Sequence, residues 1–147
     1  MNASANPVDG IFNGSPEVPN VVGETVADGV DMIYATGLVP QRADFAYTQD
    51  PALVGKIHWT QPAAGDTVNP GSTVWYIEYR PQVANVVGKP VSEGMQMIQS
   101  LGYAPQRADL WPTQDPNLVG TIAQTQPAAS QNLESGATVW YIEYKAE

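Results

Sequence analysis

The chain has 147 residues and a formal net charge of −9, with only six Lys and Arg residues. This balance excludes nucleic acids and anionic membranes as partners, because both require clustered basic side chains. It contains no cysteine, which excludes disulfides and thiolate metal sites, and no stretch approaches the ~20 apolar residues of a membrane span, so we expect neither a secretion signal nor an anchor.

Residues 1–17 stand apart from the rest of the chain and are rich in Asn, Ala, Ser, Gly and Pro. This composition predicts an extended N-terminal arm without regular structure of its own. Ile11 and Phe12 form one large apolar pair in this polar setting, a pattern typical of segments that order when they dock. Two interpretations stay open: a plain terminus, or an arm that anchors the protein to an assembly through Ile11 and Phe12.

The remaining chain is a tandem repeat with an offset of 65 residues. Thr73–Tyr79 returns letter for letter as Thr138–Tyr144, and Val18–Arg80 aligns with Val83–Lys145 without a gap, with 36 identities in 63 pairs. A fixed period of this size indicates repeated structural units. We therefore predict two modules, residues 18–82 and 83–147, each near the lower size limit for independent folding.

Each module is predicted to contain one helix followed by three strands, which is an α+β fold. In the first copy Thr25 is the expected N-cap, apolar residues recur at helical spacing in Val26, Val30 and Ile33, and Gly37 ends the helix. Gly29 lies in the middle of this helix, where glycine costs about 1 kcal/mol against alanine. Close approach of the helix to the sheet would compensate for that cost.

Three strands should follow the helix in each copy. In the first copy they cover residues 38–44, an edge strand that tolerates Pro40, then residues 54–61, then the final stretch 73–79. The second copy repeats the pattern. Because side chains alternate along a strand, Val74 and Tyr76 should face the helix while Trp75, Ile77 and Tyr79 share the other face.

We call the residues of both final strands that should face away from the helix the aromatic stripe. Exposed aromatic side chains are frequent anchors for partners, whereas packing between modules or cover by the arm would make the same residues structural. Both interpretations stay open for the six members of the stripe: Trp75, Ile77, Tyr79, Trp140, Ile142 and Tyr144.

Little in the sequence indicates catalysis. His58 is the single histidine and its counterpart in the second copy is Ala123, so it belongs to no repeated site. Neither a metal-binding loop nor a phosphate-binding loop is evident, and we expect no cofactor and no enzyme activity.

A repeated basic residue is the other candidate for binding. Arg42 and Arg107 recur in Pro-Gln-Arg-Ala-Asp, with Asp44 and Asp109 two residues later and therefore expected on the same strand face. A local ion pair is one interpretation, and a ligand carboxylate held by arginine, such as that of a peptide stem, is the other.

Several short motifs occur in the same order in both copies. They are Pro19-Asn20-Val21-Val22-Gly23, Gly55-Lys56-Ile57, Gln61-Pro62-Ala63-Ala64-Gly65 and Gly71-Ser72-Thr73-Val74, matched in the second copy from Ala84 to Val139. This pattern resembles the PASTA domain, in which one helix packs on a three-stranded sheet. Ala84 and Ser130 depart from it, since the pattern usually has Pro and Gly there.

The resemblance implies tandem, non-catalytic modules of bacterial serine/threonine kinases and penicillin-binding proteins, linked to muropeptide or β-lactam sensing. No kinase or transpeptidase sequence accompanies the modules. We therefore predict a structural or adhesion protein, an accessory or decoration protein of an assembly such as a bacteriophage virion, attached to capsid or tail through the arm and able to touch host peptidoglycan. The alternative is an extracellular peptidoglycan or muropeptide sensor module of a kinase or penicillin-binding protein, located at the cell wall.

Overall fold

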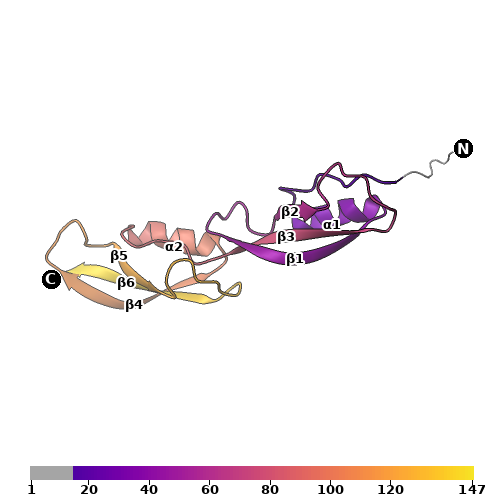
Figure 1. Cartoon of the computed structure of the whole chain (residues 1–147). Coiled ribbons are helices and arrows are strands. Elements are labelled where there is room, and N and C mark those ends of the chain that lie inside the picture. The colour runs from indigo at the N-terminus through magenta and orange to yellow at the C-terminus, as the bar shows by residue number, and fades with distance from the viewer. Residues whose placement is uncertain (1–14) are drawn as a thin grey trace, which may run out of the picture. The chain divides into compact units, whose positions relative to one another are not determined.

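The structure is a computed structural model that describes residues 15–147. Ile11 and Phe12, the predicted anchor of the arm, lie outside the described residues. The described chain contains two helices and six strands arranged as two three-stranded sheets (Figure 1). The elements are α1 (Val26–Ala35), β1 (Val39–Thr48), β2 (Ile57–Gln61), β3 (Thr73–Pro81), α2 (Val91–Ser100), β4 (Ala104–Thr113), β5 (Ile122–Gln126) and β6 (Thr138–Ala146). The predicted α+β class, one helix and three strands per module, is confirmed.

The described residues form two compact units, each with its own core. The first unit comprises the described residues up to Ala46 together with Gly55–Tyr79, and the second comprises Tyr47–Val54 together with Arg80–Glu147. The loop Tyr47–Val54 of the first repeat is thus part of the second unit. The module boundaries at residues 18–82 and 83–147 describe the sequence repeat and stay a prediction.

The final strand of each repeat is the central strand of its sheet. The strand order is β1-β3-β2 in the first sheet and β4-β6-β5 in the second. β4 runs parallel to β6, while β5 runs antiparallel to it, as β2 does to β3. The prediction of an edge strand after each helix is confirmed, and this position suits Pro40 and Pro105 because an edge strand can lack a backbone donor.

The ends of α1 follow the predicted capping residues. Thr25 is the N-cap, and its Oγ1 accepts the N–H of Asp28 at 3.2 Å. Thr36 is the C-cap, and Gly37 directly after it has a φ of 82°, with its N–H donating to the carbonyl of Tyr34 at 2.9 Å. In α2 the N-cap is Pro90, which has no hydroxyl and makes no side-chain cap.

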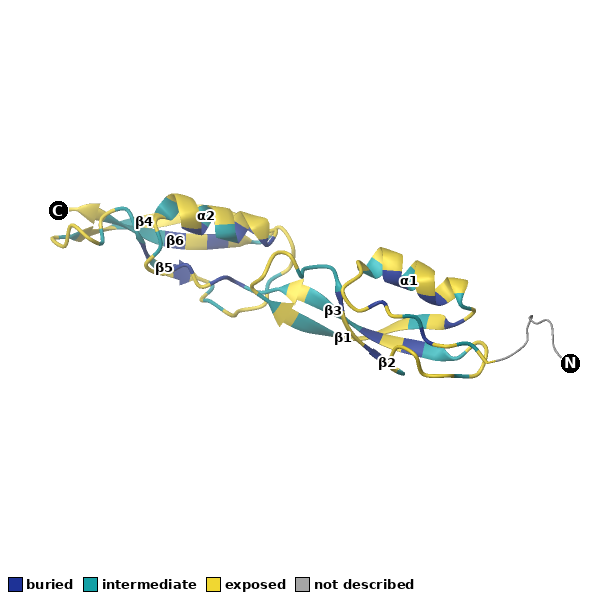
Figure 2. Ribbon diagram, turned by 90° about the horizontal axis from the view of Figure 1, so that it is seen from above, coloured by how far each residue is buried: buried dark blue, intermediate teal, exposed yellow. Residues whose placement is uncertain are grey.

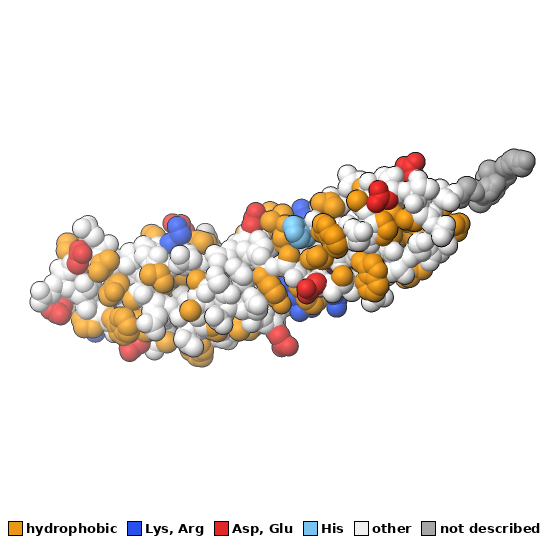
Figure 3. Space-filling view, in the orientation of Figure 1, with side chains coloured by type: hydrophobic (Ala, Val, Ile, Leu, Met, Phe, Trp, Pro, Cys, Tyr) orange, Lys and Arg blue, Asp and Glu red, His pale blue; other side chains and the backbone are white. Residues whose placement is uncertain are grey.

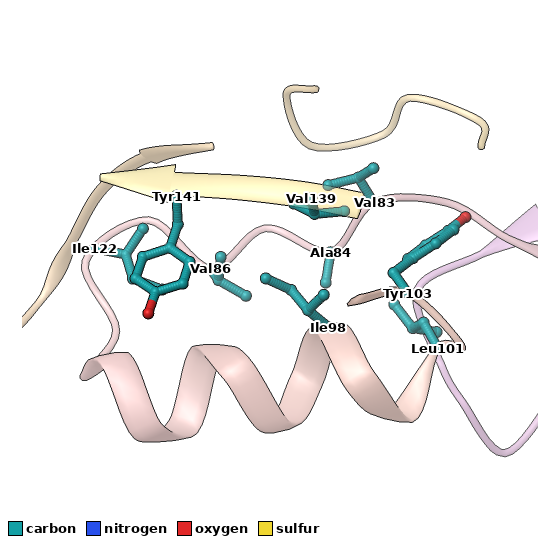
Figure 4. Packing of buried hydrophobic residues seen from close by; sticks show 9 residues of the cluster. All are labelled: Val83, Ala84, Val86, Ile98, Leu101, Tyr103, Ile122, Val139 and Tyr141. Carbon is teal, nitrogen blue, oxygen red and sulfur yellow. The ribbon is translucent and has the colours of Figure 1, made fainter. Parts of the chain in front are cut away.

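Each helix covers one face of its own sheet, and the core lies between them (Figures 1 and 2). In the first unit Ile33 of α1 is fully buried together with Ile57 of β2 and Val74 of β3. The second unit repeats this arrangement with Ile98, Ile122 and Val139, as Figure 4 shows. Burial of one such side chain stabilises the fold by about 1.5–3 kcal/mol, so a few buried residues provide much of the stability of each unit.

Gly29 allows α1 to approach the sheet closely, as expected from its position. A Cβ at Gly29 would overlap Ile57 and would lie 3.3 Å from the Cβ of Val21. We expect Gly29→Ala to lower the free energy of unfolding by about 1–3 kcal/mol in urea titrations, because overpacking outweighs the gain in helix propensity. Asp31→Ala, on the exposed side of the same helix, should change it by less than about 0.5 kcal/mol. A more stable Gly29→Ala variant would contradict this account of the close approach.

Candidate functional site

The face of each sheet that is turned away from its helix, here called the outer face, carries large aromatic side chains. On β3 the buried residues Val74 and Tyr76 point to the helix, so the alternate residues Trp75 and Ile77 point outward. Trp75 is 44% exposed, whereas Val74 is 0% exposed. This alternation agrees with the expected division of the strand into two faces, while a partner-binding role of the stripe stays a prediction.

In the second unit, amide side chains stand on both sides of the stripe. Trp140 on the central strand is opposite Gln106 of β4 and Gln126 of β5. Ile142, the next outward residue, is opposite Asp109 and Gln124. Trp140 is thus bordered on both sides by amides that can donate and accept hydrogen bonds.

Further along the same outer face, the stripe ends in an aromatic pair. Tyr144 is opposite Trp111 of β4, and the two rings meet edge to face with a centroid distance of 6.4 Å. The outer face of the second unit therefore holds two tryptophans, Trp111 and Trp140, on neighbouring strands.

The outer face of the first unit is arranged in a similar way, but its second tryptophan is Trp59 of β2, whereas that of the second unit is Trp111 of β4. Trp75 is opposite Gln61, and Ile77 is opposite Trp59 of β2. Tyr79 lies against His58, with ring centroids 4.7 Å apart and its hydroxyl 2.8 Å from His58 Nδ1. The single histidine is thus in contact with the stripe as a neighbour of Tyr79.

Every tryptophan of the chain is accessible to solvent. The chain has four, all in the described part, and their exposed fractions are 43% for Trp59, 44% for Trp75, 37% for Trp111 and 45% for Trp140. Trp59 and Trp111 were not singled out from the sequence. Tryptophan is highly buried on average, so four exposed indoles are unusual for a small domain and make the outer faces candidates for a binding surface. Figure 3 shows that hydrophobic side chains reach the surface of both units.

The two repeated arginines do not join this surface. Arg42 Nη1 lies 3.5 Å from Glu78 Oε1, and Arg107 Nη1 lies 3.3 Å from Glu143 Oε1. Arg107 is in register with Tyr141, whose side chain is in the core, so it stands on the helix side of the sheet. An exposed ion pair of this kind contributes about 0–1 kcal/mol.

The prediction that each arginine shares a face with the aspartate two residues later is wrong for Arg107. A register shift between Arg107 and Asp109 places Asp109 opposite Ile142 on the outer face. Asp109 Oδ1 instead accepts the N–H of Leu110 at 2.8 Å, and Asp44 accepts that of Phe45 in the same way. The ion pairs therefore use Glu78 and Glu143 in place of the aspartates.

Metal-binding clusters and membrane-spanning helices are both absent from the described part of the chain. Within residues 15–147 no group of three or more His, Cys, Asp or Glu side chains is placed to hold a metal ion. Neither of the two described helices is long and apolar enough to cross a membrane.

Comparison with known proteins points to one family. The family model described as the PASTA domain matches residues 16–75. A probable serine/threonine-protein kinase of Streptomyces coelicolor is 28% identical over 142 residues, which is 92% of this chain and 21% of the kinase. The chain thus spans about a fifth of the length of this curated relative.

Two solved structures are also similar, each with a TM-score of 0.41. One is the three-PASTA-domain of a Ser/Thr kinase from Staphylococcus aureus, with 23% identity, 89% of this chain covered and 67% of that chain. The other is the entire extracellular region of the Ser/Thr kinase PrkC from Staphylococcus aureus, with 13% identity and coverages of 89% and 71%.

Proposed function

We propose that this chain is a non-catalytic protein that binds bacterial peptidoglycan outside the cell. Residues 16–75 match the PASTA domain, and residues 83–145 repeat the sequence of residues 18–80. The resemblance to the PASTA domain implies this setting, and a serine/threonine-protein kinase relative is similar along 92% of the chain. Its catalytic activity is not transferred, since the similarity covers only 21% of the kinase.

The single observation that carries the proposal is the exposure of all four tryptophans, two on the outer face of each unit. A sugar ring presents a face of C–H groups that stacks on an indole, and its hydroxyls at the ring edge both donate and accept hydrogen bonds. Gln106 and Gln126 beside Trp140, and Gln61 beside Trp75, supply amides for such hydroxyls. The outer faces therefore suit the glycan part of peptidoglycan.

The cell-wall alternative is preferred over a bacteriophage virion. The predicted attachment to capsid or tail rested on Ile11 and Phe12, which lie outside the described residues, and the comparisons give no support to a capsid or tail partner. A net charge of −9 disfavours anionic ligands and is compatible with a glycan that is recognised by stacking and hydrogen bonds.

Retention on purified, insoluble peptidoglycan at physiological salt tests the proposal. We expect the full chain to sediment with the polymer, and the double variant Trp75→Ala with Trp140→Ala to stay in the supernatant while its melting temperature changes little. Tyr34→Ala is the matched control, because Tyr34 is an aromatic residue 59% exposed on α1, away from the outer face. A wild-type chain that is not retained would overturn the proposed function.

A second double variant tests whether the helix side of the sheets takes part in binding. Arg42→Ala with Arg107→Ala removes the two ion pairs with Glu78 and Glu143 and leaves the outer face intact. We expect its retention to stay within about twofold of the wild type, because the outer face is unchanged and each exposed ion pair contributes only about 0–1 kcal/mol to stability. Loss of retention in this variant alone would assign binding to the arginines and to a peptide carboxylate.

A further inference from the structure

Each outer face carries one tryptophan on its central strand, at equivalent positions of the repeat, but the two faces differ in the position of their second tryptophan. Trp59 on β2 has Gln124 as its counterpart in the second repeat. Trp111 on β4 has Ala46 as its counterpart in the first repeat. The second tryptophan therefore lies on opposite edge strands of the two sheets.

In the first unit the two tryptophans are close neighbours. Trp59 is opposite Ile77, and Trp75 lies two residues before Ile77 on the central strand. The two indoles are thus diagonal neighbours on paired strands, which lie about 7–8 Å apart. The first outer face presents one compact aromatic platform.

In the second unit the two tryptophans are separated along the sheet. Trp111 is opposite Tyr144, which lies four residues after Trp140 on β6. This part of a strand extends over about 13 Å, and Trp111 lies one strand further to the side. The second outer face therefore presents two separate aromatic contacts.

The strip between these two contacts carries polar side chains at its borders. Ile142 is opposite Gln124 of β5 and Asp109 of β4, and both polar residues are exposed. The amide can donate and accept hydrogen bonds, and the carboxylate accepts them. Such groups suit the hydroxyl and acetamido groups of sugars that lie between two stacked ones.

The spacing of the indoles sets the length of glycan that can contact both of them. One sugar of a 1,4-linked chain adds a length close to the separation of neighbouring strands, which is about 4.8 Å. Two linked sugars therefore cover the about 7–8 Å between the indoles of the first face. The about 13 Å of the second face corresponds to roughly three such steps, which requires about four sugars.

We propose that the two outer faces bind glycan segments of different length. The first face holds a disaccharide on Trp59 and Trp75. The second holds a tetrasaccharide along β6, stacked at one end on Trp140 and at the other on Trp111. This inference rests on the proposed binding of peptidoglycan, whose glycan is a linear chain of linked amino sugars. The tryptophan that is unique to each repeat determines the length that its face recognises.

Two variants of the full chain test this, because each keeps one outer face. Trp111→Ala with Trp140→Ala leaves the first face, and Trp59→Ala with Trp75→Ala leaves the second. The probes are the disaccharide and the tetrasaccharide of β-1,4-linked N-acetylglucosamine, and titration of the indole N–H signals in ¹H–¹⁵N NMR spectra gives each Kd. On the first face we expect the two values to agree within about threefold, whereas on the second the tetrasaccharide should bind at least about tenfold more tightly, because it alone links both contacts.

A conversion variant tests whether the spacing of the tryptophans, and not their number, sets the length. Gln124→Trp with Trp111→Ala, made in the chain that keeps only the second face, places an indole opposite Ile142, as Trp59 is opposite Ile77. We expect its two Kd values to agree within about threefold, as on the first face. Leucine replaces alanine in any variant whose circular dichroism shows unfolding, since it keeps apolar cover without an aromatic ring.

Two results would overturn the proposal. One is an equal gain from disaccharide to tetrasaccharide on both faces. The other is binding of neither oligosaccharide by a wild-type chain that peptidoglycan retains, since the tryptophans would then contact its peptide part. A wild-type chain that insoluble peptidoglycan does not retain would contradict the proposed function itself, so the two failures are distinguishable.

Discussion

Replacing Ile33 by alanine is expected to unfold the first unit and to leave the second unit folded. Ile33 is fully buried between α1 and the sheet, in one cluster with Ile57 and Val74. Truncation of such a residue costs about 2–5 kcal/mol, and a single core of this size supplies only about 3–5 kcal/mol in total. The loss is therefore comparable with the whole stability of the unit.

Tryptophan fluorescence in urea can follow the two units separately. With Trp111 and Trp140 changed to Phe, the remaining Trp59 and Trp75 report only on the first sheet. Their transition should move to low urea in Ile33→Ala and stay in place in Ile98→Ala, the matched variant of the second core. A shift equivalent to less than about 1 kcal/mol in Ile33→Ala would mean that this core relaxes around the cavity.

The elements were predictable because local signals and the repeat agree. Thr25 has a hydroxyl at the N-cap and Gly37 accepts a positive φ after the C-cap, so both ends of α1 are fixed by residue chemistry alone. The final strand is dense in β-branched and aromatic residues, which is typical of a strand, and it proved to be the central strand of each sheet. The strand after each helix extends further than expected, to Thr48 in the first repeat, and the next one is shorter, beginning at Ile57.

The outer faces were only partly predictable, because strand alternation fails at a register shift. Ile57 and Trp59 are two residues apart and would share a face in a regular strand. A shift at His58 reverses the alternation, so Ile57 is buried while Trp59 is 43% exposed and opposite Ile77. The same kind of shift in β4, between Arg107 and Asp109, separated the arginine from its expected partner. The amino-acid sequence of neither strand indicates the extra residue that causes the register shift.

That the loop Tyr47–Val54 belongs to the second unit could also not be predicted from the sequence. The loop belongs to the first copy by alignment, and its Asp50-Pro51 indicates only a turn. Its place is decided by tertiary contacts of Gln49 and Val54, and these involve residues more than thirty positions away, such as Gln82. A repeat fixes which residues are equivalent, but it does not fix which copy a connecting loop packs against.

Either single variant, Trp75→Ala or Trp140→Ala, is expected to weaken binding to polymeric peptidoglycan almost as much as the double variant does. The outer face is duplicated, and a polymer offers the same sugar unit many times, so under the proposed function two weak contacts on one chain would act together. Linked binding of this kind exceeds the affinity of one site by about 10²–10⁴-fold, and removing one site forfeits that gain. On insoluble peptidoglycan we therefore expect each single variant to bind at least about 100-fold more weakly than the wild type.

A short soluble fragment that can occupy only one face should behave differently, and this contrast is the control for the preceding prediction. In isothermal titration calorimetry each single variant should bind half as many fragments as the wild type, with an unchanged Kd for the face that is left. Tyr34→Ala should match the wild type on both ligands, since its exposed ring lies on α1. Single variants that lose only about twofold on the polymer would show that the two faces never engage one strand together, and each unit would then be a separate, weak binder.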